Sequence, residues 1–449
     1  MPRLFEDSRI VRSLAISGRN EAANTTIERP LVDKQGQMPE TERTAKAMQA
    51  FAQDFGRTAS IYLESCIHCG MCAEACHFYE VTHDPKYTPV WKLEPFKQAY
   101  KREHGPFALF YRTFNLKRPV TEAELENWQH LLYDSCTVCG RCSLMCPMGI
   151  DIAGLISEAR HGMARAGLAP KELREAADRG PMPKDFKERI GRLSTENGID
   201  IPVDKARADI LYTVSSTEIE QYPKSIVATA RIMKRLGENW TFRSDGYQAN
   251  NYGLLAGDAQ RQKEASMKLI EAAIACGAKT LILPECGHAY GALRWMGANI
   301  YGKPLPFKVL HISEFLADNV RSGKLKLKRL GKSVTFHDPC QSSRRGGVTE
   351  APREVLAALG TELKEMFPTK GTNWCCGGGG GVVDIRRADA LRHKVFHLKM
   401  NQIDESGADL PVTSCTDCRK TFDDGQARFK WDKSMNSLVE LVADNLIEA

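Results

Sequence analysis

The sequence lacks any hydrophobic run long enough to cross a membrane. Its apolar stretches, such as 280–284, are far shorter than the about 18 residues that a spanning helix needs. No twin-arginine pair stands near the N-terminus, and charges at Arg3, Glu6, Asp7, Arg9 and Arg12 leave no uninterrupted apolar core there. Export signals are therefore not expected. We expect a cytoplasmic chain with no membrane span of its own.

A strong excess of one charge sign is also missing. The net charge is +6 over 449 residues, with basic and acidic side chains interspersed, which makes nucleic acid a poor candidate partner. A docking face for an acidic or membrane-bound partner fits better, so we expect a peripheral position on the inner face of the cytoplasmic membrane. A dinucleotide fingerprint is missing too, because Gly377–Gly381 follows a cysteine pair and lacks the strand and helix context of G-x-G-x-x-G. No flavin or nicotinamide site is expected.

Cysteine, by contrast, is plentiful. In a chain without an export signal, 15 cysteines indicate metal or redox chemistry and not a disulfide framework. Two runs have the spacing C-x2-C-x2-C-x3-C, which is typical of bacterial ferredoxins with two [4Fe–4S] clusters. The runs are Cys66, Cys69, Cys72 and Cys76, and Cys136, Cys139, Cys142 and Cys146.

In this motif three cysteines of one turn bind one cluster, and the fourth binds the other cluster. The spacing therefore predicts that Cys146 completes the first site and Cys76 the second. Zinc and disulfides are the alternatives, but zinc knuckles usually combine paired C-x2-C units without a repeated triplet and a fourth cysteine. Cys146 precedes Pro147, as the motif prefers, whereas Cys76 precedes His77, a mild departure.

The segment between the runs, 77–135, is far longer than a compact ferredoxin needs. It mixes aromatic and basic residues, which can stack on nucleic acid or dock a redox partner. We favour helical hairpins that pack their aromatic side chains inward and keep a solvated basic face. The aromatic residues are Tyr79, Tyr87, Trp91, Phe96, Tyr100, Phe107, Phe110, Tyr111 and Phe114.

Changes in composition and in apolar periodicity along the chain predict an α+β multidomain protein. A polar arm precedes a helix expected from Thr44 to about Tyr62, and two helices after Pro147 end the helical ferredoxin domain near Gly180–Pro183. Short β-type runs then alternate with helical stretches, which indicates an α/β region. The predicted order is an extended arm (1–43), a two-cluster ferredoxin domain (44–180), a linker (181–206), a degenerate repeat (207–330) and an intact repeat (331–449); the predicted strands are 210–214, 280–283, 309–312, 334–336 and 410–412.

A third set of cysteines lies in the last repeat. An adjacent cysteine pair runs into Gly377–Gly381, where backbone without Cβ atoms could approach a bulky inorganic group closely. Five thiolates from three predicted strand ends exceed the four that one cube or one zinc ion takes. These candidate catalytic and metal-binding residues are Cys340, Cys375, Cys376, Cys415 and Cys418.

The module that carries this set occurs twice. Residues 210–216 align with 334–340, and 251–254 with 373–376, but Ser216, Gly253, Leu254 and Ala289 replace four of the five cysteines in the first copy. The first copy is therefore expected to be metal-free and to form a pseudo-twofold partner face. Its remaining Cys286, a further candidate catalytic residue, is expected with His288 near the metal of the second copy; an inert buried thiol is the equally open alternative.

These residues resemble the CCG motif of the heterodisulfide reductase family. The fusion of a two-cluster ferredoxin domain to a tandem CCG region, over about residues 60–425, is similar to the D-type subunit of heterodisulfide reductase and to DsrK-type subunits of sulfur metabolism. One intact CCG set and the remnant 284–289 resemble the DsrK type more. The resemblance implies a noncubane [4Fe–4S] cluster on the five CCG cysteines, in addition to two ordinary [4Fe–4S] clusters.

The same resemblance implies a catalytic oxidoreductase subunit that reduces or forms a disulfide or trisulfide of a DsrC-like sulfur-carrier protein. Its implied partners are a membrane cytochrome b-type subunit and other electron-transfer subunits. Arg344 and Arg345 could offset substrate or cluster charge, or could be ordinary surface residues. The alternative function is an electron relay, because iron–sulfur subunits of glycolate, lactate and glycerol-3-phosphate dehydrogenases share this layout and pass electrons from a flavin subunit towards quinone.

Overall fold

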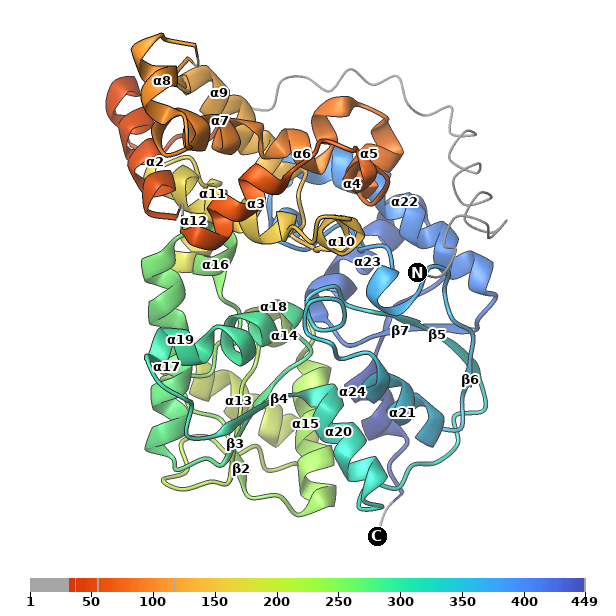
Figure 1. The fold of residues 1–449 in the computed structure, drawn as a ribbon. Coiled ribbons are helices and arrows are strands. Elements are labelled where there is room, and N and C mark those ends of the chain that lie inside the picture. The colour runs from red at the N-terminus through yellow and green to blue at the C-terminus, as the bar shows by residue number, and fades with distance from the viewer. Residues whose placement is uncertain (1–31, 37, 55, 117, 448–449) are drawn as a thin grey trace.

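The computed structural model describes residues 32–447 apart from 37, 55 and 117, so most of the predicted arm lies outside the described residues. The N-terminal part is built from helices and short helical turns, which form the upper layer in Figure 1. They are α2 (Glu40–Asp54), α3 (Arg57–Ser65), α4 (Met71–Glu74), α5 (His77–Thr82), η2 (Pro85–Tyr87), α6 (Pro89–Lys92), α7 (Glu94–Glu103), α8 (Ala108–Thr113), α9 (Glu122–Gln129), η3 (His130–Asp134), α10 (Arg141–Met145), α11 (Ile152–Arg165) and α12 (Lys171–Asp178).

The helix expected from Thr44 to Tyr62 is instead two helices, α2 and α3. Gly56 precedes α3 with extended backbone (φ −62°, ψ 173°), which ends the helical path between them. α2 packs its buried Phe51 against α11, where Gly162 leaves room for the ring: a Cβ there would lie 1.9 Å from the ring carbon Cε1. The two helices after Pro147 are confirmed as α11 and α12.

The segment 77–135 is helical, as predicted, but its aromatic side chains divide into two groups. Tyr87, Phe96 and Tyr100 are buried, and Phe96 packs beside Phe51 and Trp128. The expectation that the aromatic residues all pack inward is wrong for a second group, because α8 lies at the outer end of this layer with no buried residue. The exposed aromatic residues are Trp91, Phe107, Phe110 and Phe114.

The rest of the chain contains two parallel sheets with the same strand order. The first is ordered β2-β1-β3-β4 and the second β6-β5-β7-β8, and neighbouring strands within each sheet run parallel, as buried strands with helical crossovers require. All five predicted strands exist. The strands are β1 (Ile210–Tyr212), β2 (Trp240–Thr241), β3 (Thr280–Leu283), β4 (Lys308–His311), β5 (Ser333–His337), β6 (Glu362–Leu363), β7 (Leu410–Thr413) and β8 (Asn436–Ser437).

The repeated strand order agrees with the alignment of the two copies, since β1 corresponds to β5 and β3 to β7. A pseudo-twofold relation between the copies stays a prediction. The fold is thus a helical ferredoxin-type part followed by mixed helices and parallel sheets. The helices around the first sheet are α13 (Pro183–Asn197), α14 (Ser216–Gln221), α15 (Pro223–Leu236), α16 (Tyr252–Ala256), α17 (Ala259–Ala275), α18 (Gly287–Tyr290), η4 (Gly291–Trp295), α19 (Gly297–Tyr301) and α20 (Ile312–Arg321).

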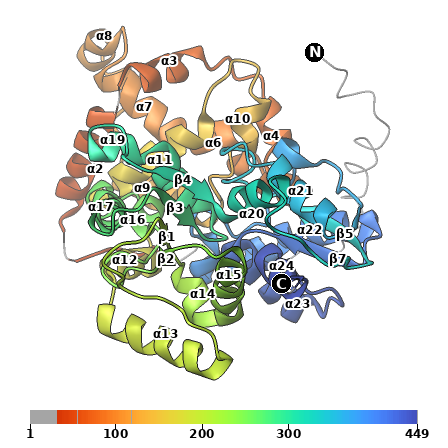
Figure 2. The same cartoon turned by 90° about the horizontal axis from the view of Figure 1, so that it is seen from below.

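Both sheets share one apolar core. A single cluster of buried side chains joins Ile210 and Ile282 of the first sheet to Val334 and Val412 of the second, so the copies form one body (Figure 2). α13, inside the segment expected to be a linker, contributes Phe186 to this cluster. The helices around the second sheet are α21 (Glu350–Ala358), η5 (Lys370–Thr372), η6 (Val382–Asp384), η7 (Arg386–Ala388), α22 (Asp389–Ser406), α23 (Thr416–Phe429) and α24 (Leu438–Asp444). None of the helices described is long and apolar enough to cross a membrane.

Candidate iron–sulfur sites

The first cysteine run forms a tight turn between α3 and α4. Its residues His68 and Gly70 take left-handed backbone angles (φ 54° and 82°), which fold the turn back on itself. Cys69 is exposed. The run lines one pocket together with the last cysteine of the second run, in the exchange that the motif predicts: Cys66, Cys69, Cys72 and Cys146.

The second run repeats this turn almost residue for residue. Val138 and Gly140 take the left-handed angles here (φ 51° and 76°), at the same positions after the first cysteine as His68 and Gly70. This turn lies deeper in the molecule, beside the buried Lys92, whose Nζ lies 3.7 Å from Cys76 Sγ. The second pocket again follows the predicted exchange: it is lined by Cys76, Cys136, Cys139 and Cys142.

The third set gathers at the carboxyl ends of the second sheet, where parallel sheets place their ligand sites. Cys340 follows β5 and Cys415 follows β7, and the adjacent cysteines Cys375 and Cys376 lie in the loop after β6. Cys375 Sγ lies 4.0 Å from Cys340 Sγ, and Cys376 Sγ lies 3.5 Å from Cys418 Sγ. All five side chains are buried in one apolar cluster.

The ionisation of these thiols fits a bound metal group. Burial raises the pKa of Cys72 to about 11 and that of Cys142 well above its usual range, because an apolar surrounding disfavours a thiolate. Hydrogen bonds from neighbouring thiols, first from Cys139, lower the pKa of Cys375 instead. Buried thiolates on this scale need cations to compensate them, and iron in a cluster supplies that charge. The residues therefore fit clusters, whereas the ligand role of each cysteine stays a prediction.

The glycine loop packs closely against two distant segments, while its expected approach to an inorganic group stays a prediction. At Gly380 a Cβ would lie 2.8 Å from the carbonyl carbon of Thr137, and at Gly381 it would lie 2.7 Å from Leu173. Gly380 and Gly381 also have φ values of 64° and 85°, which other residues rarely adopt. The glycines thus allow the loop to pack against the turn of the second run and against α12, so they join the sheet region to the helical layer.

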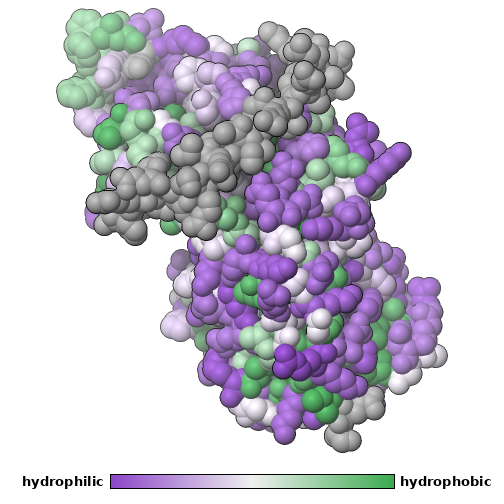
Figure 3. Space-filling view, turned by 90° about the vertical axis from the view of Figure 1, so that its right-hand side faces the viewer, coloured by the Kyte–Doolittle hydropathy of each residue, from purple (hydrophilic) through white to green (hydrophobic). Residues whose placement is uncertain are grey.

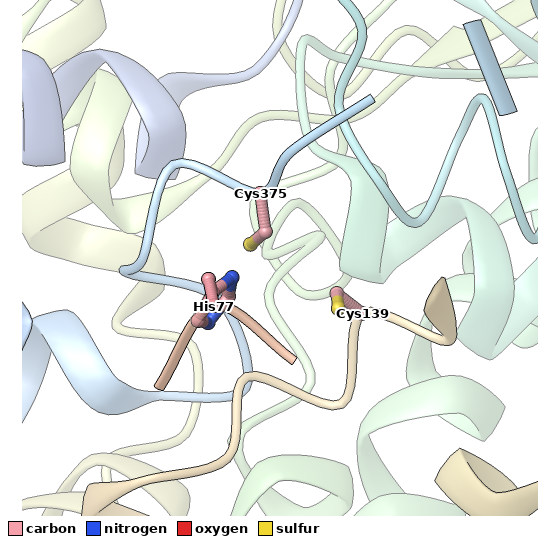
Figure 4. Close-up of side chains that lie close together, drawn as sticks. All are labelled: His77, Cys139 and Cys375. Atoms are coloured by element: carbon pink, nitrogen blue, oxygen red, sulfur yellow. The ribbon is translucent and has the colours of Figure 1, made fainter. Parts of the chain in front are cut away.

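Side chains of the second and third sites meet at one junction. Figure 4 shows His77, Cys139 and Cys375 converging from three separate segments. Their sulfur atoms and one imidazole nitrogen all lie within 4.8 Å of one another. His77 is buried, and it directly follows Cys76 in the chain. His77, which is a mild departure from the motif, therefore lies beside two candidate cluster sites.

Arginines hold this junction together. Arg344 donates to the carbonyl oxygens of Cys139 (2.9 Å) and Asn373, and Arg141 stacks on Trp374 with its guanidinium carbon 3.6 Å from the ring centre. Of the two arginines after Cys340, Arg344 is thus an internal connector, whereas Arg345 pairs with Asp151 at the start of α11. These contacts fix the distance between the second and third sites.

Two further groups lie beside the third site, and no sequence motif marks them. Lys399 is fully buried and donates to Asn373 Oδ1 and to Met366 Sδ (3.6 Å), and burial lowers its pKa to about 7. His337 is also fully buried, neither of its ring nitrogens has a hydrogen-bond partner among the described residues, and a ring nitrogen lies within 4.8 Å of the Cys376 and Cys418 sulfurs. An unpartnered buried imidazole is costly, so a hydrogen-bond acceptor or metal beside it would offset that cost.

The remnant of the first copy lies beside the third site, as predicted. The carbonyl of Glu285 accepts a hydrogen bond from Thr416 N–H (2.7 Å), and His288 Nε2 accepts one from Gly380 N–H (3.1 Å). Cys286, however, is buried in a different apolar cluster from the five CCG cysteines. A catalytic role for Cys286 stays a prediction, as does its alternative as an inert thiol.

Comparison with known proteins agrees with this arrangement. Residues 62–150 match the family described as 4Fe-4S dicluster domain, and residues 334–423 match the family described as cysteine-rich (CCG) domain. The chain is 28% identical over 397 residues to the D-type subunit of the dihydromethanophenazine:CoB–CoM heterodisulfide reductase of Methanosarcina barkeri, across 86% of this chain and 94% of that protein.

Two other relatives share most of this chain. An Hdr-like menaquinol oxidoreductase iron-sulfur subunit 2 of Archaeoglobus fulgidus is 24% identical over 87% of this chain and 81% of its own length. An EtfAB:quinone oxidoreductase of Syntrophomonas wolfei is 27% identical over 83% of this chain and 56% of its own length. The chain is thus an iron–sulfur protein that joins a 4Fe-4S dicluster domain to a cysteine-rich CCG domain, and its homologues include D-type subunits of heterodisulfide reductase and Hdr-like iron–sulfur subunits.

Proposed function

We propose that this chain is the catalytic iron–sulfur subunit of a heterodisulfide reductase-like complex of the DsrK type. It reduces or forms a disulfide or trisulfide of a small sulfur-carrier protein. Two [4Fe–4S] clusters on the two ferredoxin-type sets relay electrons to a third, noncubane cluster on the five CCG cysteines. The domain limits are those predicted above, with the arm at 1–43, the ferredoxin domain at 44–180, the linker at 181–206 and the two repeats at 207–330 and 331–449.

The junction at His77 is the observation that carries this proposal. Cys139 of the second set lies beside Cys375 of the third, with their sulfurs within 4.8 Å of each other. The first set lies at the surface, because Cys69 is exposed and its neighbour Ile67 is 63% exposed. The three sets therefore follow one another from the surface to the buried CCG site, which is the order that electron delivery to a buried active site requires.

The chemistry of the buried site follows from its surroundings. Cleavage of an R–S–S–R′ bond consumes two electrons and two protons and yields two thiols, and the reverse reaction releases them. The clusters, when bound, would supply the two electrons one at a time, and the CCG cysteines would hold the cluster that binds one substrate sulfur in the interval. The chain contributes an apolar shell that excludes water and two basic side chains, Arg344 and Lys399, near sulfur that becomes more negative on reduction.

Relatives support the proposed setting of the protein. The names of the homologues include heterodisulfide reductase and Hdr-like menaquinol oxidoreductase subunits, and menaquinol is a membrane carrier. We propose a peripheral position on the inner face of the cytoplasmic membrane, held by a membrane cytochrome b-type subunit. The exposed edge of the first set around Cys69 is the surface at which that subunit would exchange electrons.

Substitution of the CCG pair tests the function. Cys375→Ser and Cys376→Ser should abolish dye-linked reduction of a disulfide-bearing carrier protein while both ferredoxin-type clusters remain reducible. Cys276→Ser is the matched control, because Cys276 is buried in the first copy and its thiol donates to Ala273 O within the same helical turn (3.5 Å). If Cys375→Ser or Cys376→Ser still reduced the carrier protein, the catalytic role of the CCG pair would be refuted.

The relay function makes the opposite prediction for substrate. An iron–sulfur subunit that only passes electrons between a flavin partner and quinone should be indifferent to any disulfide carrier. The relative named EtfAB:quinone oxidoreductase is the observation that favours this second function. Two results together would establish the relay function. The unaltered chain would reduce no disulfide carrier, and Cys376→Ser would still transfer electrons to a quinone analogue.

A further inference from the structure

The outer end of the helical layer carries an apolar surface that no part of the described chain covers. We call it the apolar tip. Two of its rings, Phe110 and Phe114, pack against each other with centroids 4.7 Å apart, and none of the residues of α8 is buried. Its members and their exposed fractions are Phe107 (65%), Leu109 (72%), Phe110 (51%), Phe114 (63%) and Leu116 (59%).

The tip projects away from the three cysteine sets and from both sheets. α8 lies at one extreme of the molecule in Figures 1 and 2, beyond α7 and α9. In Figure 3 apolar side chains gather at the upper left, over this same end. The shape matters, because a protruding group of large apolar side chains suits insertion into a soft surface, whereas a groove suits a helix or strand of another protein.

The chain segment that carries the tip is mainly basic in sequence. The segment 101–118 contains five basic residues and one acidic residue, Glu103. Arg112, on α8 itself, is half exposed and lies 3.8 Å from Glu103, and Arg118 is also exposed but pairs with Glu124 (2.7 Å). Arg112 and Arg118 thus lie beside the apolar side chains, in a chain whose positive and negative charges are otherwise nearly balanced.

We infer that the apolar tip inserts into the interfacial region of an anionic lipid bilayer. Exposed Phe and Leu side chains are favourable at the boundary of headgroups and acyl chains, and basic residues beside them are attracted to acidic lipids. A contiguous exposed apolar patch of this kind marks an interaction site and not an ordinary surface. Direct contact with lipid goes beyond the proposed function, since it needs neither a membrane subunit nor sulfur chemistry.

Vesicle binding tests this inference on the purified full chain with its clusters. The chain should sediment with phosphatidylcholine vesicles that contain phosphatidylglycerol, and more weakly with phosphatidylcholine alone or at high salt. Leu109→Asp combined with Phe110→Asp should lower the partition coefficient about tenfold or more, because two apolar side chains no longer enter the interface. Both residues are exposed, so the fold and iron content should not change.

Ile274→Asp is the matched control, because Ile274 is 42% exposed at the far end of α17, away from the tip. It should bind vesicles like the unaltered chain. Absence of vesicle binding by the unaltered chain would overturn the inference and leave the tip as a site for a protein partner. Equal binding by the double variant and the control would overturn it too, and so would equal binding to both vesicle compositions. Disulfide reduction is measured on the same samples, so that a failure of vesicle binding can be told apart from a failure of the proposed function.

Discussion

Arg160 offers a perturbation whose magnitude can be worked from the structure. This buried side chain on α11 donates hydrogen bonds to the carbonyl oxygens of four residues in three regions of the chain. They are Leu132 (2.8 Å and 3.1 Å), Cys136 (2.9 Å), Leu255 (2.9 Å) and Gly380 (2.8 Å). One guanidinium thus joins the turn of the second cysteine run, the first copy and the glycine loop.

Replacement of Arg160 by Leu would leave four buried carbonyl oxygens without these donors. Each unsatisfied buried group costs about 1–3 kcal/mol. Even the lower value gives a loss on the order of 4 kcal/mol in the free energy of unfolding. Arg160→Lys keeps the positive charge, but a single ammonium group cannot reach all four oxygens, so its loss should be intermediate.

Urea unfolding, followed by circular dichroism and by cluster absorbance, measures this loss. Arg165→Leu is the control, because Arg165 is exposed on the same helix, and it should change stability by no more than about 0.5 kcal/mol. The absorbance of the second and third clusters should be lost first in Arg160→Leu. A variant within about 1 kcal/mol of the control would refute the role of Arg160 as the connector of three regions.

Three further predictions concern single side chains. His77→Ala should leave the iron content unchanged but slow reduction of the third site by about tenfold or more, measured by freeze-quench paramagnetic resonance; an unchanged rate would remove His77 from the electron path. Burial raises the pKa of Glu218 to about 8, above about 4.3 in an unfolded chain, so the native state loses stability as pH rises from about 4 through 8. Glu218→Gln should therefore narrow the difference between urea midpoints at pH 6 and pH 9, and an unaltered difference would contradict this origin. Cys286→Ser should keep all the iron, since Cys286 belongs to a different apolar cluster from the CCG cysteines; loss of iron would make it a ligand.

Sequence patterns predict the parts of this protein that depend on local spacing. The motif fixes which cysteines share a turn, and the exchange of Cys76 and Cys146 between the two pockets follows from it. Short apolar runs predict five strands because buried parallel strands are continuous apolar segments. These patterns miss three strands, β2, β6 and β8. Each has only two residues, which is too short to form a recognisable apolar run.

What the sequence could not predict depends on contacts between distant segments. At Gly380 and Gly381 the glycine loop packs against Thr137 and Leu173, from a domain more than 200 residues earlier in the chain, and no local pattern indicates these contacts. His77 and His337 stand close to motif cysteines in the chain without any spacing that marks their role. The aromatic residues of the insertion have similar local patterns, so only tertiary structure separates buried Phe96 from exposed Phe110.

The most direct test of the central claim is paramagnetic resonance of the third site. The chain, purified without oxygen and mildly oxidised, would be measured with and without an oxidised disulfide-bearing carrier protein. We predict a signal in the oxidised state that changes when the carrier is added and that is lost in Cys376→Ser. Signals that arise only on reduction and are indifferent to any disulfide would contradict the catalytic function, and would leave the chain as an electron relay.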